Sequence, residues 1–143
     1  MGVDFVAFRS LAAGQPAVYG SEQYSAEFND YLFFFSSSEN KMIFENDPTY
    51  YLPAWGGFCA YGIAHEVVWN VNNLGPSADP SYWWISGDGV LYLFRSSKPL
   101  GKFVSDADRN IEHGDAMWRE WFGDNAMTPF NTFCFCDGAC TVD

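Results

Sequence analysis

Hydrophobic and polar positions alternate in two stretches of the chain, and a turn signal interrupts each stretch. In the first, Tyr24, Ala26 and Phe28 alternate with polar neighbours, Asn29-Asp30 follows, and residues 31–35 form an apolar run rich in aromatic rings. This pattern predicts a β-hairpin whose second strand is buried on both faces. In the second, residues 82–85 and 90–94 flank Ser86-Gly87-Asp88-Gly89. Asp-Gly tolerates the positive φ of a tight turn, so another hairpin is expected.

Helical patterns are short, except near the C-terminus. Ser36 and Glu39 form a capping-box pattern before a short helix, which Asn46-Asp47-Pro48 ends, and residues 50–52 predict one more turn. The longest pattern predicts one helix over residues 98–122, with Gly123 after its last turn. Residues 4–20 read as a loop with a short strand, and residues 70–80 as a surface loop.

These elements predict an α+β fold, in which a small antiparallel sheet of two hairpins packs with short helices. At 143 residues the chain is long enough for one domain, which we place at residues 1–123. Residues 124–143 show no periodicity and are expected to form an irregular, cysteine-bearing C-terminal tail.

Charge and composition exclude several kinds of partner. The net charge is −11, and nucleic acid binding needs Lys and Arg to replace the counterions of the phosphate backbone, so a nucleic acid partner is not expected. No apolar run approaches the roughly 20 residues of a membrane-spanning helix. Aromatic residues reach 20%, which suits a small core but also a surface that contacts a protein partner.

The four cysteines allow two kinds of chemistry. Cys59 stands alone, whereas Cys134, Cys136 and Cys140 lie close together near the end of the chain. They can form disulfides, including a clamp from the tail to Cys59, or provide thiolates to a metal ion, although no paired C-x2-C knuckle is present. Disulfides favour a compartment outside the cytosol, and because the chain opens on no signal sequence, any leader would have been removed.

The segment around Cys59 resembles a known family. Gly56-Gly57-Phe58-Cys59-Ala60-Tyr61 is similar to the G-G-[YF]-C-A-[YW] block of stand-alone YHS-domain proteins. Further blocks agree in order and spacing over about residues 4–122, namely Asp4-Phe5-Val6-Ala7-Phe8, Ser38-Glu39-Asn40, Asp47-Pro48, Asp79-Pro80, Leu91-Tyr92-Leu93 and Asp115-Ala116-Met117-Trp118. Phe5 departs from the usual proline of the family, and the tail has no counterpart in it.

The resemblance implies a small α+β fold, and because related modules occur in metal-handling proteins, it also points to a metal. Cys59 is then the first candidate ligand, because a thiolate is a soft donor suited to copper or zinc. The same residue could simply pack in the core. His65 is a second candidate ligand, and the three tail cysteines are alternatives. His113 lies between Glu112 and Asp115, but no nucleophile is placed beside it, so catalysis there is not expected.

Two functions follow from the sequence. The first is a non-enzymatic YHS-like module that binds copper or zinc. The alternative is a structural or accessory subunit that docks on a larger protein assembly through aromatic surface and a disulfide-clamped tail. No nucleophile–base pair, phosphate loop or paired carboxylates indicate an enzyme.

Overall fold

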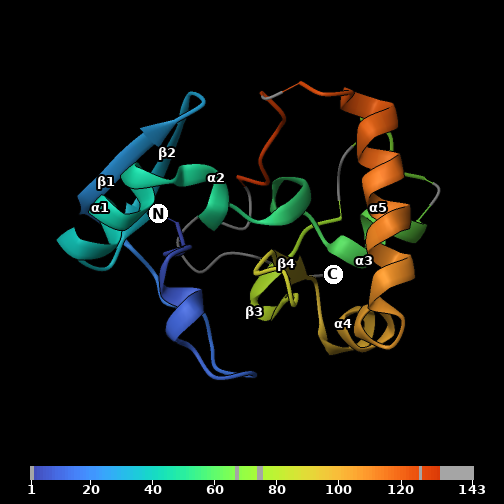
Figure 1. Cartoon of the computed structure of the whole chain (residues 1–143), viewed down its shortest axis with the longest axis horizontal. Coiled ribbons are helices and arrows are strands. Elements are labelled where there is room, and N and C mark those ends of the chain that lie inside the picture. The colour runs from blue at the N-terminus through green and yellow to red at the C-terminus, as the bar shows by residue number, and fades with distance from the viewer. Residues whose placement is uncertain (1, 67, 74–75, 126, 133–143) are drawn as a thin grey trace.

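The computed structural model describes residues 2–66, 68–73, 76–125 and 127–132 and has the predicted α+β fold (Figure 1). In chain order the elements are η1 (Ala7–Ser10), β1 (Ser21–Phe28), β2 (Tyr31–Phe35), α1 (Ser38–Asn46), α2 (Pro48–Tyr51), η2 (Ala54–Gly57), α3 (Ala60–His65), β3 (Asp79–Ile85), β4 (Leu91–Phe94), α4 (Ser97–Val104) and α5 (Ala107–Phe122). In the described ranges, no helix combines the length and apolarity needed to cross a membrane.

Both predicted hairpins are present, and each forms its own two-stranded antiparallel sheet. Asn29 and Asp30, at φ of 50° and 65°, make the tight turn between β1 and β2. The expectation that β2 is buried on both faces is only partly met, because residues 33–35 are buried while Leu32 is 61% exposed. At the start of β2, one face of the strand is therefore exposed to solvent.

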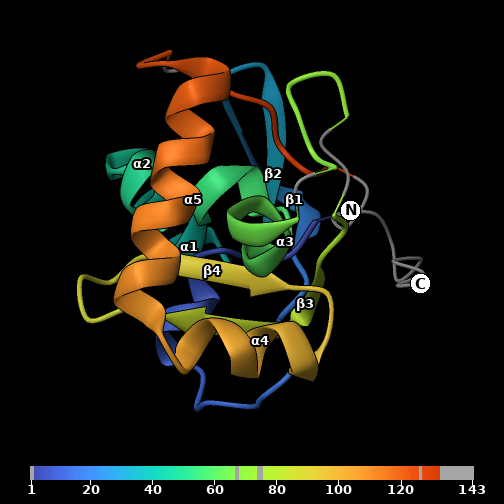
Figure 2. The ribbon, with the colours of Figure 1, turned by 90° about the vertical axis from the view of Figure 1, so that its right-hand side faces the viewer.

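Two hydrophobic clusters divide the molecule. The first gathers η1, the β1–β2 hairpin and α1 around aromatic rings that include Phe5, Phe33, Phe35 and Phe44. The second gathers η2, α3, β4, α4 and α5 around residues that include Phe94 and Phe103. Figure 2 shows α3 beside α5, with the β3–β4 hairpin below them and α4 at the base. Every residue of β4 is buried: Leu91 and Leu93 pack in the first cluster, and Tyr92 and Phe94 pack in the second, so this strand lies between the two clusters.

The predicted helix over residues 98–122 is wrong in one respect: it is two helices. α4 ends at Val104, and Asp106 has an extended φ of −144° before α5 starts. The buried amide of Asn110 explains the break, because its Nδ2 donates to the carbonyl oxygens of Lys102 (3.3 Å) and Phe103 (2.8 Å) at the end of α4. Gly123 follows the last residue of α5 at φ 59°, as predicted.

The start of α1 also differs from the prediction by one residue. Ser37, not Ser36, is the N-cap, and its hydroxyl accepts from the amide of Asn40 at 3.1 Å. Ser36 instead donates its hydroxyl to the carboxylate of Asp4 at 2.6 Å. A preference for serine at an N-cap does not distinguish two adjacent serines, and the contact with Asp4 decides between them.

The N-terminal segment has no strand of its own. Where a short strand was expected in residues 4–20, the structure has η1 and a single bridge between Val3 and Tyr19. The carboxylate of Asp4, which is fully buried, accepts from the amides of Val6 and Ala7 and organises this turn. This segment forms a hydrogen-bonded turn and not a strand, because the side chain of Asp4 takes the place of a backbone hydrogen-bond acceptor.

A segment after α5 connects the two clusters. It crosses back over the middle of the molecule (Figure 1), and in the described residues 124–125 and 127–132 it contains no helix or strand, as expected. Asn131 is 4% exposed; its amide donates to the carbonyl of Gly56 (2.8 Å) and its Nδ2 to that of Gly57 (3.3 Å). Cys134, Cys136 and Cys140 lie outside the described residues.

Candidate metal centre

Cys59 lies in the second hydrophobic cluster. It is 0% exposed, precedes α3, and its amide donates to the carbonyl of Pro76 at 2.8 Å. Burial raises the pKa of the Cys59 thiol, and the backbone amides of Gly62 and Arg95 only partly oppose this shift. The thiol therefore stays protonated near neutral pH, whereas a metal ligand must be a thiolate. Cys59 is a free thiol, and the tail cysteines of the predicted clamp lie outside the described residues.

His65 is the last residue of α3, at the opposite end of this helix from Cys59, and it faces α5. Its Nε2 lies 2.5 Å from Oδ1 of Asn110. The orientation of this amide is fixed, because Nδ2 of Asn110 donates to two carbonyl groups of α4. Oδ1 must then accept, so Nε2 of His65 carries a hydrogen. In the neutral ring, Nδ1 holds the available lone pair.

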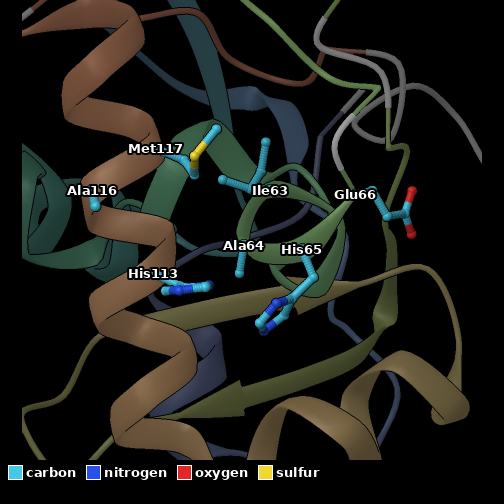
Figure 3. A pocket seen from close by; sticks show the side chains of 7 residues that line it. All are labelled: Ile63, Ala64, His65, Glu66, His113, Ala116 and Met117. Carbon is cyan, nitrogen blue, oxygen red and sulfur yellow. The ribbon is translucent and has the colours of Figure 1, made fainter.

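His113 lies on α5, one turn after Asn110, and meets His65 across the gap between the helices. The centres of the two imidazole rings are 5.2 Å apart, with 43° between their planes. Figure 3 shows both rings at the same end of a pocket between α3 and α5. The ring of His65 also lies 5.0 Å from that of Tyr61. The sequence interpretation considered the two histidines separately and did not pair them.

The pocket that holds the two rings has a volume of about 300 Å³. Its other lining residues are mainly apolar: Ile63, Ala64, Ala116 and Met117, with Glu66 at one side (Figure 3). The Glu66 carboxylate is engaged elsewhere, because it forms an ion pair with Arg95 and accepts from Nε1 of Trp69 at 2.8 Å. The two imidazoles are thus the nitrogen donors that this pocket offers to a ligand, together with the thioether sulfur of Met117.

The structure brings together only part of the predicted site. Over the described ranges, no group of three or more His, Cys, Asp and Glu side chains could hold a metal ion. Cys59 and His65 do not converge, and His113, which sequence reasoning considered only for acid–base chemistry, pairs with His65 instead. The chain contains only two histidines, and this was the one signal in the sequence that could have suggested considering them as a pair.

The six tryptophans do not form an exposed patch. All six are described; Trp55 is buried, and the other five are partly covered. Among the described residues, the exposed aromatic side chains are those of Tyr19, Tyr50 and Tyr82, on three separate segments. The aromatic content of the chain therefore serves mainly the two hydrophobic clusters.

Comparisons with known proteins give no assignment: no family model, curated protein or solved structure matches the chain.

Proposed function

We propose that this protein is a non-enzymatic, YHS-like module that binds a copper or zinc ion, and that His65 and His113 are its ligands. This proposal keeps the metal expected from the sequence but moves the site from Cys59 to the pocket between α3 and α5. Its main support is the pairing of the two rings, with Nε2 of His65 already committed to Asn110.

The spacing of the rings suits two ligands of one ion. With metal–nitrogen bonds of about 2.0–2.1 Å and a tetrahedral angle, the centres of two imidazoles stand about 5 Å apart. The observed separation is 5.2 Å. His113 is exposed, so its side chain can turn a ring nitrogen toward the ion, whereas His65 is held in place. Imidazole is a preferred donor for copper and zinc.

The hydrogen bond to Asn110 supports the same assignment. A histidine that binds a metal usually donates its second ring hydrogen to an oxygen of the protein, which fixes the tautomer and orients the ring. The amide oxygen of Asn110 occupies this position toward His65, and Asn110 is itself 5% exposed. We therefore expect the ion at Nδ1 of His65. Two protein ligands leave other coordination positions for water or a second donor, which favours capture and release over permanent storage.

The experiment measures binding of zinc and of copper(I) to the whole chain by equilibrium dialysis with elemental analysis. We expect one equivalent of metal, and a loss of at least roughly tenfold in affinity for His65→Ala and for His113→Ala. The matched control replaces Cys134, Cys136 and Cys140 by Ser and should bind as the parent does. Because the chain has two histidines, the imidazole NMR signals of each can be assigned from the variant that lacks the other.

Two results of this experiment would contradict the proposal. If both histidine variants retain the metal and the triple serine variant loses it, the ligands are the tail cysteines. If none of the proteins binds either ion, the alternative of an accessory subunit becomes the better interpretation. Circular dichroism of each variant establishes that the fold is retained.

A further inference from the structure

A second cavity lies between the two hydrophobic clusters, away from the histidine pocket. Its volume is about 390 Å³, within the range of pockets that hold small molecules. Its lining includes Phe28 at the end of β1, Trp55 in η2, Trp118 on α5 and Phe130 in the crossing segment. We call this cavity the aromatic cleft. Binding sites are commonly found where two packed units meet, which is the position of this cleft.

The walls of the aromatic cleft are held in place by the rest of the fold. The ring of Phe130 packs edge-on against Tyr31, with centres 5.1 Å apart, and the ring of Trp118 lies 4.7 Å from that of Phe122. Asn131 ties the crossing segment to the carbonyl groups of Gly56 and Gly57. A cleft with fixed walls does not have to be ordered when a ligand binds, so less free energy of binding is lost.

Trp55 gives an independent reason to look for a ligand here. Its backbone is left-handed, at φ 50° and ψ 47°, a conformation that is rare for a bulky residue. The conformation is maintained by a hydrogen bond from Nε1 of Trp55 to Oδ1 of Asp115 (3.0 Å) and by close packing on Gly114. Backbone conformations of this kind concentrate at binding and active sites.

The chemistry of the lining indicates the class of ligand. None of the residues that line the cleft is ionisable, so neither an anion nor a cation finds an ion pair there. An anion would also be repelled by the net charge of −11. The aromatic rings suit a planar molecule, and Thr49 and Thr128 add hydroxyl groups to the lining of the cleft.

From these observations we propose that the aromatic cleft binds an uncharged, planar, multi-ring compound that carries hydrogen-bonding groups on its edge. This site is independent of the histidine pocket and of the metal.

The test uses lumichrome, a neutral three-ring compound, and flavin mononucleotide, which carries a related ring system with a phosphate. Equilibrium dialysis with the whole chain should give saturable binding of one equivalent of lumichrome and affinity at least roughly tenfold lower for flavin mononucleotide. Thr128→Trp, which fills the cleft, should lower the affinity for lumichrome by at least roughly tenfold. The matched control is Met127→Trp, at an adjacent residue that is 54% exposed and does not line the cleft.

Thr49→Trp fills the cleft from α2 and provides a second variant if Thr128→Trp does not fold. Three outcomes overturn the proposal: lumichrome does not bind to the parent protein, flavin mononucleotide binds as tightly as lumichrome, or every folded cleft-filling variant retains the parent affinity. Lumichrome binding that weakens equally in Met127→Trp also overturns it, since the effect would then not come from the cleft.

Discussion

The indole ring of Trp55 lies so close to the backbone of α5 at Gly114 that a methyl group at position 114 would overlap its carbons Cη2, Cζ2 and Cζ3. Gly114 is buried in the middle of a 16-residue helix, where glycine normally costs stability relative to alanine. The contact explains why glycine is present there. It lets α5 approach η2 closely enough for Asp115 to accept the indole hydrogen of Trp55.

The first prediction follows from this contact. Gly114→Ala should lower the free energy of unfolding by about 1–3 kcal/mol, because overpacking outweighs the gain in helix propensity. Gly101→Ala is the matched control, since Gly101 is also helical and has no atom near the position of a Cβ. It should raise stability by about 0.5–1 kcal/mol. Urea unfolding of both variants measures the difference, and changes of the same sign would contradict the packing argument.

The second prediction concerns Asp4, whose carboxylate accepts hydrogen bonds from the amides of Val6, Ala7 and Ser36, from the hydroxyl of Ser36 and from Nδ2 of Asn40. Asp4→Ala leaves the buried amides of Val6 and Ala7 and the partly buried donors of Ser36 and Asn40 without their acceptor, so the free energy of unfolding should fall by about 3 kcal/mol or more. Glu22→Ala, at an exposed carboxylate on β1, should change it by about 0.5 kcal/mol or less. Denaturant unfolding monitored by tryptophan fluorescence compares them, and similar midpoints would refute the role given to Asp4.

The third prediction concerns the reactivity of Cys59. In a variant with Ser at positions 134, 136 and 140, Cys59 is the one thiol that remains. Since Cys59 is fully buried and burial raises its pKa, we expect its reaction with a disulfide reagent to be roughly 100-fold slower in the native protein than in concentrated guanidinium chloride. Comparable rates in the two conditions would show that the thiol is accessible, and would restore it as a candidate ligand.

The fourth prediction is a loss of stability in alkali. Burial raises the pKa of Tyr92 to about 12, and the carboxylates of Asp115 and Asp88 contribute to the shift. A tyrosine in the unfolded chain titrates near pH 10, so between about pH 10 and 12 the unfolded state binds fewer protons than the folded state. The free energy of unfolding should therefore fall as pH rises through this window.

Tyr92→Phe retains the ring but removes the titrating hydroxyl, so its free energy of unfolding should fall less steeply over the same window. Tyr82→Phe, at a tyrosine that is 36% exposed, is the control and should keep the parent slope. Guanidinium unfolding at several pH values measures the three slopes. A Tyr92→Phe slope equal to that of the parent would show that another group dominates the alkaline transition.

Local signals were sufficient to predict much of the fold. Both hairpins could be predicted because their turn residues and alternating side chains lie within a few positions of one another, as in Asn29-Asp30. The break between α4 and α5 could not be predicted in this way. Residues 98–122 keep a helical pattern throughout, and the break depends on the side chain of Asn110 reaching back to Phe103. The spacing of apolar residues along the sequence gives no information about this contact.

The candidate site was less predictable than the fold. His65 was a candidate from its residue type, but its partner depends on the packing of α3 on α5, which brings His113 opposite it. Cys59 was favoured by its position beside two glycines, yet burial decides its chemistry, and burial is a property of the assembled core. Residues 134, 136 and 140 lie outside the described residues, so their predicted disulfide or metal role stays a prediction.

The link between Asn131 and Gly56 has a consequence for how the polypeptide is made. A growing chain exposes η2, α3 and β4 long before residue 131 leaves the ribosome. Until then the carbonyl groups of Gly56 and Gly57 lack the amide hydrogens that they bind in the finished molecule. The central junction therefore forms only after residue 131 has been synthesised, and a translation product that stops shortly after α5 would leave this junction accessible to chaperones and proteases.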